Sequence, residues 1–247
     1  IERLIDQKLR KVTNHLVSVS KYCSSTITSR RTFKDLKSIK TIPNGIELEN
    51  SKDGVNLRDV YGISKSKNIL LMVSTFEERK GHEFALNALK IALSQRDDLH
   101  LLLVGTATNN EIGRVQRLID ERGLKNDVTI TGRIDNIANS MSAANLIIIP
   151  SQDYESFALT AVEAMLNELP IVATNIGGIP ETIGQDGHCG FLVDPGEPDK
   201  FSEKILYIVD NPEFSKKMGA NGLSRALDVF DPKKMAREYH KLTRTKS

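Results

Sequence analysis

Short apolar runs recur along the chain, and longer stretches with apolar residues at helical spacing separate them. The apolar runs lie at 15–19, 69–73, 99–104, 128–130, 146–149, 171–173 and 191–193. Several have no polar position, which is typical of strands buried on both faces of a sheet. The intervening helices are predicted at 83–94, 110–123, 135–143 and 159–168. This alternation predicts an α/β fold, with a doubly wound, Rossmann-like parallel sheet and right-handed crossovers.

The regular alternation occupies residues 65–195, and different patterns flank it. After it, only helices are predicted, at 199–209, 212–229 and 231–245. Before it, a helix at 1–12, a strand at 15–19, a helix at 21–30 and a short strand at 38–42 lead to a Pro-Asn-Gly turn at 43–45. So few elements cannot bury their own faces. They are interpreted either as the end of another α/β domain or as an addition to the edge of this one.

The composition of the 247-residue chain is that of a globular protein, with 39% hydrophobic and 27% charged residues. It argues against disorder, collagen and low-complexity scaffolds. The formal net charge is only +2, so we expect no nucleic-acid partner unless a local basic patch exists. The basic stretch from Lys233 to Lys246 is a candidate patch, and we favour its interpretation as a solvated helix face.

The two cysteines, Cys23 and Cys189, exclude a disulfide framework and a zinc site built from cysteines. We therefore expect reduced thiols in a cytoplasmic protein. The longest apolar runs are far shorter than a bilayer span. The first residue is Ile1 and not Met, so we expect the chain to be a fragment of a longer product.

Two glutamates stand out after the apolar run at 146–149, because ligands of open parallel sheets bind beyond the carboxyl ends of the strands. Glu155 lies in the predicted loop, and Glu163 follows eight positions later in the predicted helix. The segment 156–160 should form the helix start, where unpaired amides favour an anion and small residues allow a phosphate to approach. Glu163 either accepts hydrogen bonds from ligand hydroxyls or is a helix-start glutamate stabilised by the dipole or a nearby cation.

Further loops at the same predicted edge carry glycines or cations. Taken singly, each also fits an ordinary turn or, for the cations, a solvated loop paired with Glu77 and Glu78. No Gly-rich phosphate loop, metal-ligand pattern or nucleophile elbow is present in the sequence, so no metal site is expected. The candidate positions are Arg79 and Lys80, Gly105 and Thr106, Thr131, Gly132 and Arg133, and Gly177 and Gly178.

Together and in this order, the loops resemble the nucleotide-binding half of retaining glycosyltransferases of the GT-B fold that share a Glu-x7-Glu motif (family four of the sequence classification). The motif is set in Pro-Ser-x-x-x-Glu-Ser-Phe-Ala-Leu-x-x-x-Glu-Ala-Met at 150–165. The segments 169–181 and 187–193 follow as in the family, and 43–46 matches the junction between its two halves. The resemblance covers about residues 15–230 and divides the chain into 1–42, a remnant of the acceptor-binding domain, 43–230, the donor-binding domain, and 231–247, a helix that crosses back.

The resemblance implies roles for individual residues. Glu163 would hold the ribose hydroxyls of the donor nucleotide and Glu155 the hydroxyls of the transferred sugar. Lys80 matches the phosphate-binding lysine that stabilises the leaving nucleoside diphosphate, a charge effect that requires no metal cofactor. The catalytic set is then Lys80, Arg79 and Glu155, and the remaining donor-binding set is Glu163, Ser156, Phe157, Ala158, Leu159, Thr160, Gly177, Gly178, Thr75, Gly132 and Arg133.

Two departures from the family matter. Where relatives carry Gly-Arg-Leu, this chain has Ser74-Thr75-Phe76, so Thr75 replaces the usual phosphate arginine and Arg79 is expected to supply that charge. Most of the acceptor-binding half is also missing.

The resulting hypothesis is transfer of a hexosyl group from a nucleotide-sugar donor to a glycan or lipid-linked acceptor with retention of configuration. Cell-envelope polysaccharide synthesis in the cytoplasm, or at the inner face of the membrane, is the expected setting. The alternative is a non-catalytic nucleotide-sugar or glycan-binding module. A nucleotide-sugar epimerase, the third hypothesis, would need catalytic carboxylates that the sequence does not identify.

Overall fold

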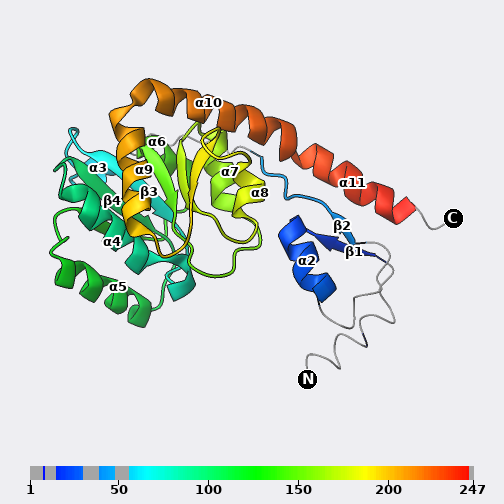
Figure 1. Cartoon of the computed structure of the whole chain (residues 1–247), viewed down its shortest axis with the longest axis horizontal. Helices are drawn as coiled ribbons and strands as arrows, with labels where there is room; N and C mark the ends of the chain where they lie inside the picture. The colour runs from blue at the N-terminus through cyan, green and yellow to red at the C-terminus, as the bar shows by residue number, and fades with distance from the viewer. Residues whose placement is uncertain (1–7, 9–14, 30–38, 48–55, 245–247) are drawn as a thin grey trace.

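The computed structural model describes residues 15–29, 39–47 and 56–244, together with Lys8. The helix expected at 1–12 lies, apart from Lys8, outside the described residues. The body of the described chain is a sheet with helices on both faces (Figure 1). The prediction of a doubly wound α/β fold is therefore confirmed.

The main sheet has six parallel strands in the order β5-β4-β3-β6-β7-β8. Their bounds are Asn68–Val73 for β3, Leu99–Val104 for β4, Val128–Gly132 for β5, Leu146–Ile149 for β6, Ile171–Thr174 for β7 and Gly190–Val193 for β8. The chain winds outward from β3 through β4 to β5, then returns beside β3 at β6 and winds the other way. The carboxyl ends of β3 and β6 are thus the point where the strand order reverses, the usual ligand position in such folds.

Burial on both faces explains why β4, β6 and β7 contain mostly apolar residues. Every residue of these three strands is buried. Alternate side chains enter two separate cores: Leu71 and Ile147 pack on one face, and Leu70 and Ile148 on the other. The pleat thus gives each strand two apolar faces, as the sequence pattern predicts.

The helices divide between these two cores. One face is covered by α3 (Leu57–Val60), α6 (Ile137–Ala143), α7 (Leu159–Leu166) and α8 (Ile179–Ile183). The other is covered by α4 (His82–Leu93), α5 (Asn109–Arg122) and α9 (Pro198–Asp210). A 3-10 turn, η1 (Glu78–Lys80), precedes α4, and α10 (Pro212–Val229) contributes to both cores.

Helix α7 ends two residues earlier than the periodicity predicts. Glu168 has a left-handed backbone with φ 55°, which stops the helix at Leu166. Gly219 of α10 lies against this turn, since an added Cβ would be 2.0 Å from the Glu168 carbonyl oxygen. The early end of α7 therefore makes room for α10.

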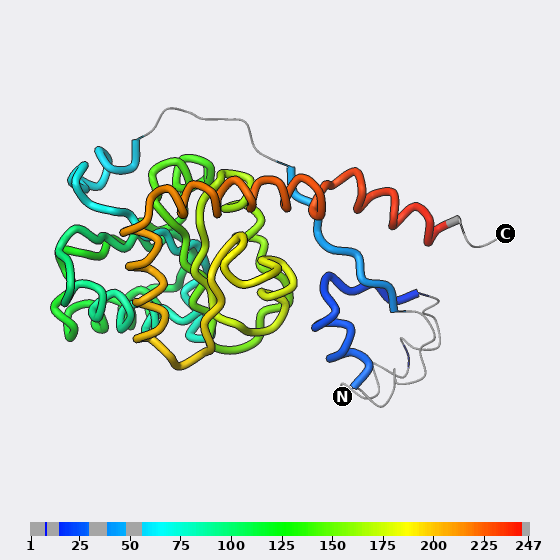
Figure 2. The backbone as a smooth tube through the Cα atoms, turned by 45° about the horizontal axis from the view of Figure 1, so that its top comes forward, coloured from blue at the N-terminus to red at the C-terminus, as the bar shows by residue number. Residues whose placement is uncertain are grey.

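The N-terminal unit comprises β1 (Leu16–Ser18), α2 (Lys21–Ser29) and β2 (Ile39–Thr41). In the described part of the chain, β1 and β2 pair with each other in parallel and not with the six-stranded sheet. The interpretation as an edge addition is therefore wrong, because the two strands form a sheet of their own. Figure 2 shows this unit beside the main body.

Helices α10 and α11 (Pro232–Arg244) connect the two parts. They run one after the other from the main body to the N-terminal unit (Figures 1 and 2). On α11, Glu238 pairs with Lys40 of β2 at 2.5 Å. The segment after β2 is held too, because the Ile46 amide donates to the Phe230 carbonyl oxygen at 3.0 Å. Over the described residues, no helix has both the length and the apolar character needed to cross a bilayer.

Candidate functional site

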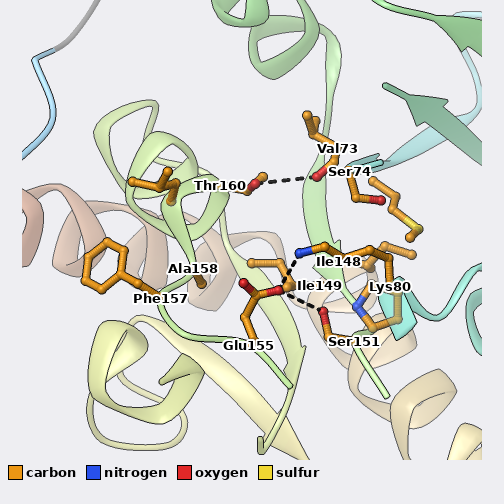
Figure 3. Close-up of a pocket in the computed structure, with 13 residues that line it drawn as sticks. Val73, Ser74, Lys80, Ile148, Ile149, Ser151, Glu155, Phe157, Ala158 and Thr160 are labelled. Carbon is orange, nitrogen blue, oxygen red and sulfur yellow. Dashed lines mark hydrogen bonds and ion pairs between the residues drawn. The ribbon is translucent and has the colours of Figure 1, made fainter. Parts of the chain in front are cut away.

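A cavity of about 190 Å³ opens at the carboxyl ends of β3 and β6, where the strand order reverses. It lies between the turn that precedes α4 and the start of α7 (Figure 3). The lining residues are Met72, Val73, Ser74, Lys80, Ile148, Ile149, Pro150, Ser151, Glu155, Phe157, Ala158, Leu159 and Thr160.

An ion pair between Lys80 and Glu155 dominates this cavity. The Lys80 Nζ atom lies 2.5 Å from Glu155 Oε2, and the side chains are only 18% and 12% exposed. The Ser151 hydroxyl donates to the same carboxylate oxygen at 3.3 Å. An ammonium group has three N–H donors, so Lys80 can hold Glu155 and still offer donors to an anion in the cavity.

Lys80 reaches this position because of the glycine that follows it. Gly81 has φ 79°, a left-handed backbone, and an added Cβ would lie 1.9 Å from the Pro150 carbonyl oxygen. The Gln152 amide also donates to the Arg79 carbonyl oxygen at 2.8 Å. The loops after β3 and β6 are therefore in direct backbone contact, which places Lys80 opposite Glu155.

The neutral ring of His82 lies beneath this turn. His82 is 1% exposed and stacks on Phe76, with ring centroids 4.4 Å apart. Burial, assisted by the charge of Arg114, lowers the pKa of His82 to about 4. The ring is therefore uncharged near neutral pH and does not add to the charge of Lys80.

The two glycines at 177–178 contact the backbone of Glu155. The Gly178 amide donates to the Glu155 carbonyl oxygen at 2.7 Å. Gly177 has φ 60°, and an added Cβ would lie 2.1 Å from that oxygen. Neither glycine is among the described residues that line the cavity. Their role in the structure is to position the loop.

The start of α7 faces the cavity through Phe157, Ala158, Leu159 and Thr160. Ala158 precedes the helix and provides no side-chain hydrogen bond to its first turn. The Thr160 hydroxyl donates to the Val73 carbonyl oxygen at 3.4 Å, which ties the helix to β3. A helix start without a capping side chain is suited to an anion.

Glu163 lines a different cavity from Glu155. It is half-buried and lines a second cavity of about 210 Å³ with Ile46, Glu47, Asp135, Ile137, Ala138, Leu166 and Asn167. The two glutamates of the eight-residue spacing therefore line two separate cavities, and α7 contributes residues to both. A ligand that touched both glutamates would have to extend along the first turns of α7, because Glu163 follows Leu159 and Thr160 by one turn on the same helix face.

The other predicted binding residues lie outside the first cavity as the described residues define it. Arg79 donates to Glu77 Oε2 at 2.7 Å and to the Tyr154 carbonyl oxygen at 3.2 Å. Thr75 donates to the other carboxylate oxygen of Glu77 at 2.8 Å. The hydrogen bond from Arg79, and to a smaller extent that from Thr75, lowers the pKa of Glu77. Arg79 would have to leave Glu77 to meet a phosphate.

Gly132 and Arg133 lie at the end of β5. Gly132 has φ 74° and Arg133 forms an exposed ion pair with Asp135 at 3.0 Å. Asp135 lines the second cavity. The loop after β5 therefore borders the same cavity as Glu163.

Ser74 and Ser151 are site residues that the sequence reasoning missed. The Ser74 hydroxyl oxygen is buried and has no hydrogen-bond partner in the described structure, although Ser74 lines the cavity. Ser151 holds Glu155. Both residues come one or two positions after a buried strand, so a hydroxyl at a strand's carboxyl end was the available signal.

The site can bind an anion and orient hydroxyl groups. Lys80, the start of α7 and the Ser74 hydroxyl offer donors, and Glu155 offers an acceptor. Among the residues described, no group of three or more His, Cys, Asp or Glu side chains could hold a metal ion.

Comparison with known proteins finds a family model that matches most of this chain. Residues 55–225 match the model of the family described as glycosyl transferases group 1. The chain is 36% identical over 164 residues to MMP alpha-(1->4)-mannosyltransferase of Mycolicibacterium hassiacum, covering 66% of this chain and 39% of that protein. It is 29% identical over 208 residues to N-acetyl-alpha-D-glucosaminyl L-malate synthase of Bacillus anthracis, covering 83% and 53%. The chain thus spans about half the length of its curated relatives.

Solved structures share the fold. Sucrose-phosphate synthase from Thermosynechococcus elongatus superimposes with a TM-score of 0.84 at 27% identity, covering 98% of this chain and 60% of that one. The Anabaena protein Alr3699/HepE, solved with UDP and glucose, gives 0.85 at 23% identity, covering 98% and 66%. This second likeness shows the fold alone. From the family match, the chain belongs to the glycosyl transferases group 1 family.

Proposed function

We propose that this chain carries the donor-binding half of a retaining glycosyltransferase, which moves a hexosyl group from a nucleotide diphosphate sugar to a glycan or lipid-linked acceptor. The observation that carries the proposal is the Lys80–Glu155 pair at the start of α7. The relatives include proteins named as mannosyltransferases, and one protein of the same fold was solved with UDP and glucose. Both facts support a nucleotide-sugar donor.

In this proposal, the two cavities divide the donor between them. The diphosphate lies in the first cavity against Lys80 and the start of α7, and Glu155 accepts hydrogen bonds from sugar hydroxyls. The ribose lies on the side of Glu163 in the second cavity. Lys80 stabilises the charge that develops on the departing diphosphate, so the reaction proceeds without a metal ion.

Calorimetry with UDP, GDP and ADP tests the donor site. We expect one of them to bind the chain, and Lys80→Ala to weaken it roughly tenfold or more, because a charge-assisted contact is lost. Glu163→Ala should weaken the same nucleotide. Lys200→Ala is the matched control, since Lys200 of α9 forms an exposed pair with Glu197, the residue before that helix. Absence of binding at millimolar concentrations of all three nucleotides would refute the proposal.

The second candidate is a non-catalytic module that binds nucleotide sugars. It is favoured by Thr75, which replaces the family's phosphate arginine, and by Arg79, which is engaged by Glu77. Both reduce the positive charge available to a leaving group. Transfer assays with the complete gene product distinguish the two candidates, because a module of this kind binds donor without releasing nucleoside diphosphate. Glu77→Gln, which would loosen Arg79, should raise the rate only if the protein is an enzyme.

A further inference from the structure

The loop that carries Glu155 is held by three separate segments of the chain. The carbonyl oxygens at 154–156 accept, in order, from the Arg79 guanidinium at 3.2 Å, the Gly178 amide at 2.7 Å and the Ser20 hydroxyl at 2.7 Å. The first donor follows β3 and the second begins α8. The third lies in the N-terminal unit. The backbone on both sides of Glu155 is thus fixed from three directions.

Ser20 joins the N-terminal unit directly to this loop. Its hydroxyl accepts the Cys23 amide at 3.1 Å, as a residue before a helix does, and donates to the Ser156 carbonyl oxygen. An added Cβ on Gly178 would lie 2.3 Å from that oxygen and 3.2 Å from the Ser20 hydroxyl. The residue before α8, the loop of Glu155 and the N-terminal unit are therefore in direct contact.

Glu181 of α8 binds the first turn of α2. Its two carboxylate oxygens accept the amides of Lys21 and Tyr22 at 2.8 and 2.7 Å. A carboxylate at a helix N-terminus satisfies unpaired donors and interacts favourably with the helix dipole. Glu181 of α8 thus holds α2, and Gly178, the residue before α8, holds the Glu155 carbonyl oxygen.

We propose that the N-terminal unit positions the candidate donor site, with Ser20 and Glu181 as the positioning residues. Seating of α2 fixes the loop of Glu155, and occupation of the site fixes the same loop from the other side. The two events therefore favour each other, because a coupling between sites acts in both directions. The part that concerns the ligand rests on the proposed function.

Cys23 provides a reporter for the seating of α2. Its thiol is buried, lies 3.5 Å from the Tyr154 hydroxyl and donates to the Ser156 carbonyl oxygen at 3.7 Å. When α2 leaves the loop, this thiol becomes accessible. Cys189 is also buried but lies next to β8, so it serves as an internal control in the same molecule.

The first experiment measures alkylation of both thiols by iodoacetamide in the 247-residue chain, with mass spectrometry of the labelled peptides. We expect Ser20→Ala and Glu181→Ala to accelerate labelling of Cys23 roughly tenfold and to leave Cys189 unchanged. Glu181→Gln retains an acceptor oxygen and should fall between wild type and Glu181→Ala. The control is Glu203→Ala on α9, whose side chain is 68% exposed.

Unchanged labelling of Cys23 in both alanine variants would overturn the proposal. Equal acceleration at Cys189 would overturn it as well, because the variants would then loosen the whole fold. Hydrogen exchange of the peptide 153–158 completes this test without any ligand. Ser20→Ala should accelerate its exchange while β4 stays protected, and an unchanged peptide would contradict a positioning role.

The second experiment uses whichever of UDP-glucose, GDP-mannose or ADP-glucose binds the wild-type chain. Its affinity should fall roughly fivefold in Ser20→Ala, and in the wild type it should slow labelling of Cys23 by a similar factor. Full affinity together with unaltered labelling would overturn the coupling. Failure of every nucleotide sugar to bind the wild type would instead refute the proposed function, and hydrogen exchange would still decide the positioning of the loop.

Discussion

Acid should destabilise this protein through His82, the first residue of α4. The ring is 1% exposed, and its Nδ1 atom has no hydrogen-bond partner in the described structure. Its pKa falls from 6.5 to about 4, chiefly because burial penalises the charged form. Since the folded-state pKa is depressed, the unfolded chain takes up this proton first as the pH falls. The free energy of unfolding therefore decreases between pH 6.5 and pH 4.

The size of the effect follows from these two pKa values. Over the full window, the linkage amounts to about 3 kcal/mol, of which about 2 kcal/mol is lost between pH 7 and pH 5. Well below pH 4, this group adds no further change, because both states are then protonated. A loss of about 2 kcal/mol is a large part of the stability of an ordinary domain.

Urea unfolding at pH 7 and pH 5 measures the loss. His82→Gln removes the titration, so the decrease between the two pH values should be about 2 kcal/mol smaller in the variant than in the wild type. Comparing each protein with itself removes the cost of the substitution and the contributions of other groups, such as His100, whose pKa is also lowered by burial. His240→Gln on exposed α11 is the control. An equal decrease in the free energy of unfolding between pH 7 and pH 5 in His82→Gln and in the wild type would refute the reasoning.

Three further predictions concern the glycine before α4, the core and the charge of the site. Gly81→Ala should cost more than about 3 kcal/mol in urea unfolding, since its Cβ would lie 1.9 Å from the Pro150 carbonyl oxygen. Gly123→Ala, also at positive φ but with nothing within 4 Å, should cost only about 1 kcal/mol, and equal costs would contradict the contact argument. Phe201→Ala should cost about 4 kcal/mol, because this buried ring packs edge-on against Phe84, and a cost below about 1 kcal/mol would contradict that packing. EDTA should leave nucleotide binding in calorimetry unchanged, because we propose that Lys80 provides the cationic contact, and a marked loss of affinity would point to a bound metal.

Most of the main sheet could be predicted from the sequence because burial on both faces leaves a local pattern. Runs such as 146–149 are apolar at every position and coincide with β6. Short elements and helix ends were harder to predict from the sequence. Helix α3 has four residues and was not predicted, and the end of α7 depends on the left-handed backbone of Glu168, a residue type that gives no local signal for it.

The candidate site was partly predictable for the same reason. Lys80 and Glu155 each follow a buried strand, so the sequence places both at one edge of a parallel sheet. Their contact additionally requires β3 and β6 to be neighbours, although the two residues lie 75 positions apart. Strand order is set by which faces pack together, and a local pattern does not encode it.

Tertiary structure also decided how the charges and the helix ends are used. In the folded chain, Arg79 pairs with Glu77, and Ser20 donates to the backbone of the loop that carries Glu155. Glu163 lines a different cavity from the one that Glu155 lines. Periodicity and motif spacing therefore determined the fold class, the family resemblance and the choice of Lys80 and Glu155 as candidate residues. Packing of distant segments decided the rest, because the direction of a side chain and the partner of a carbonyl depend on neighbours far away in the sequence.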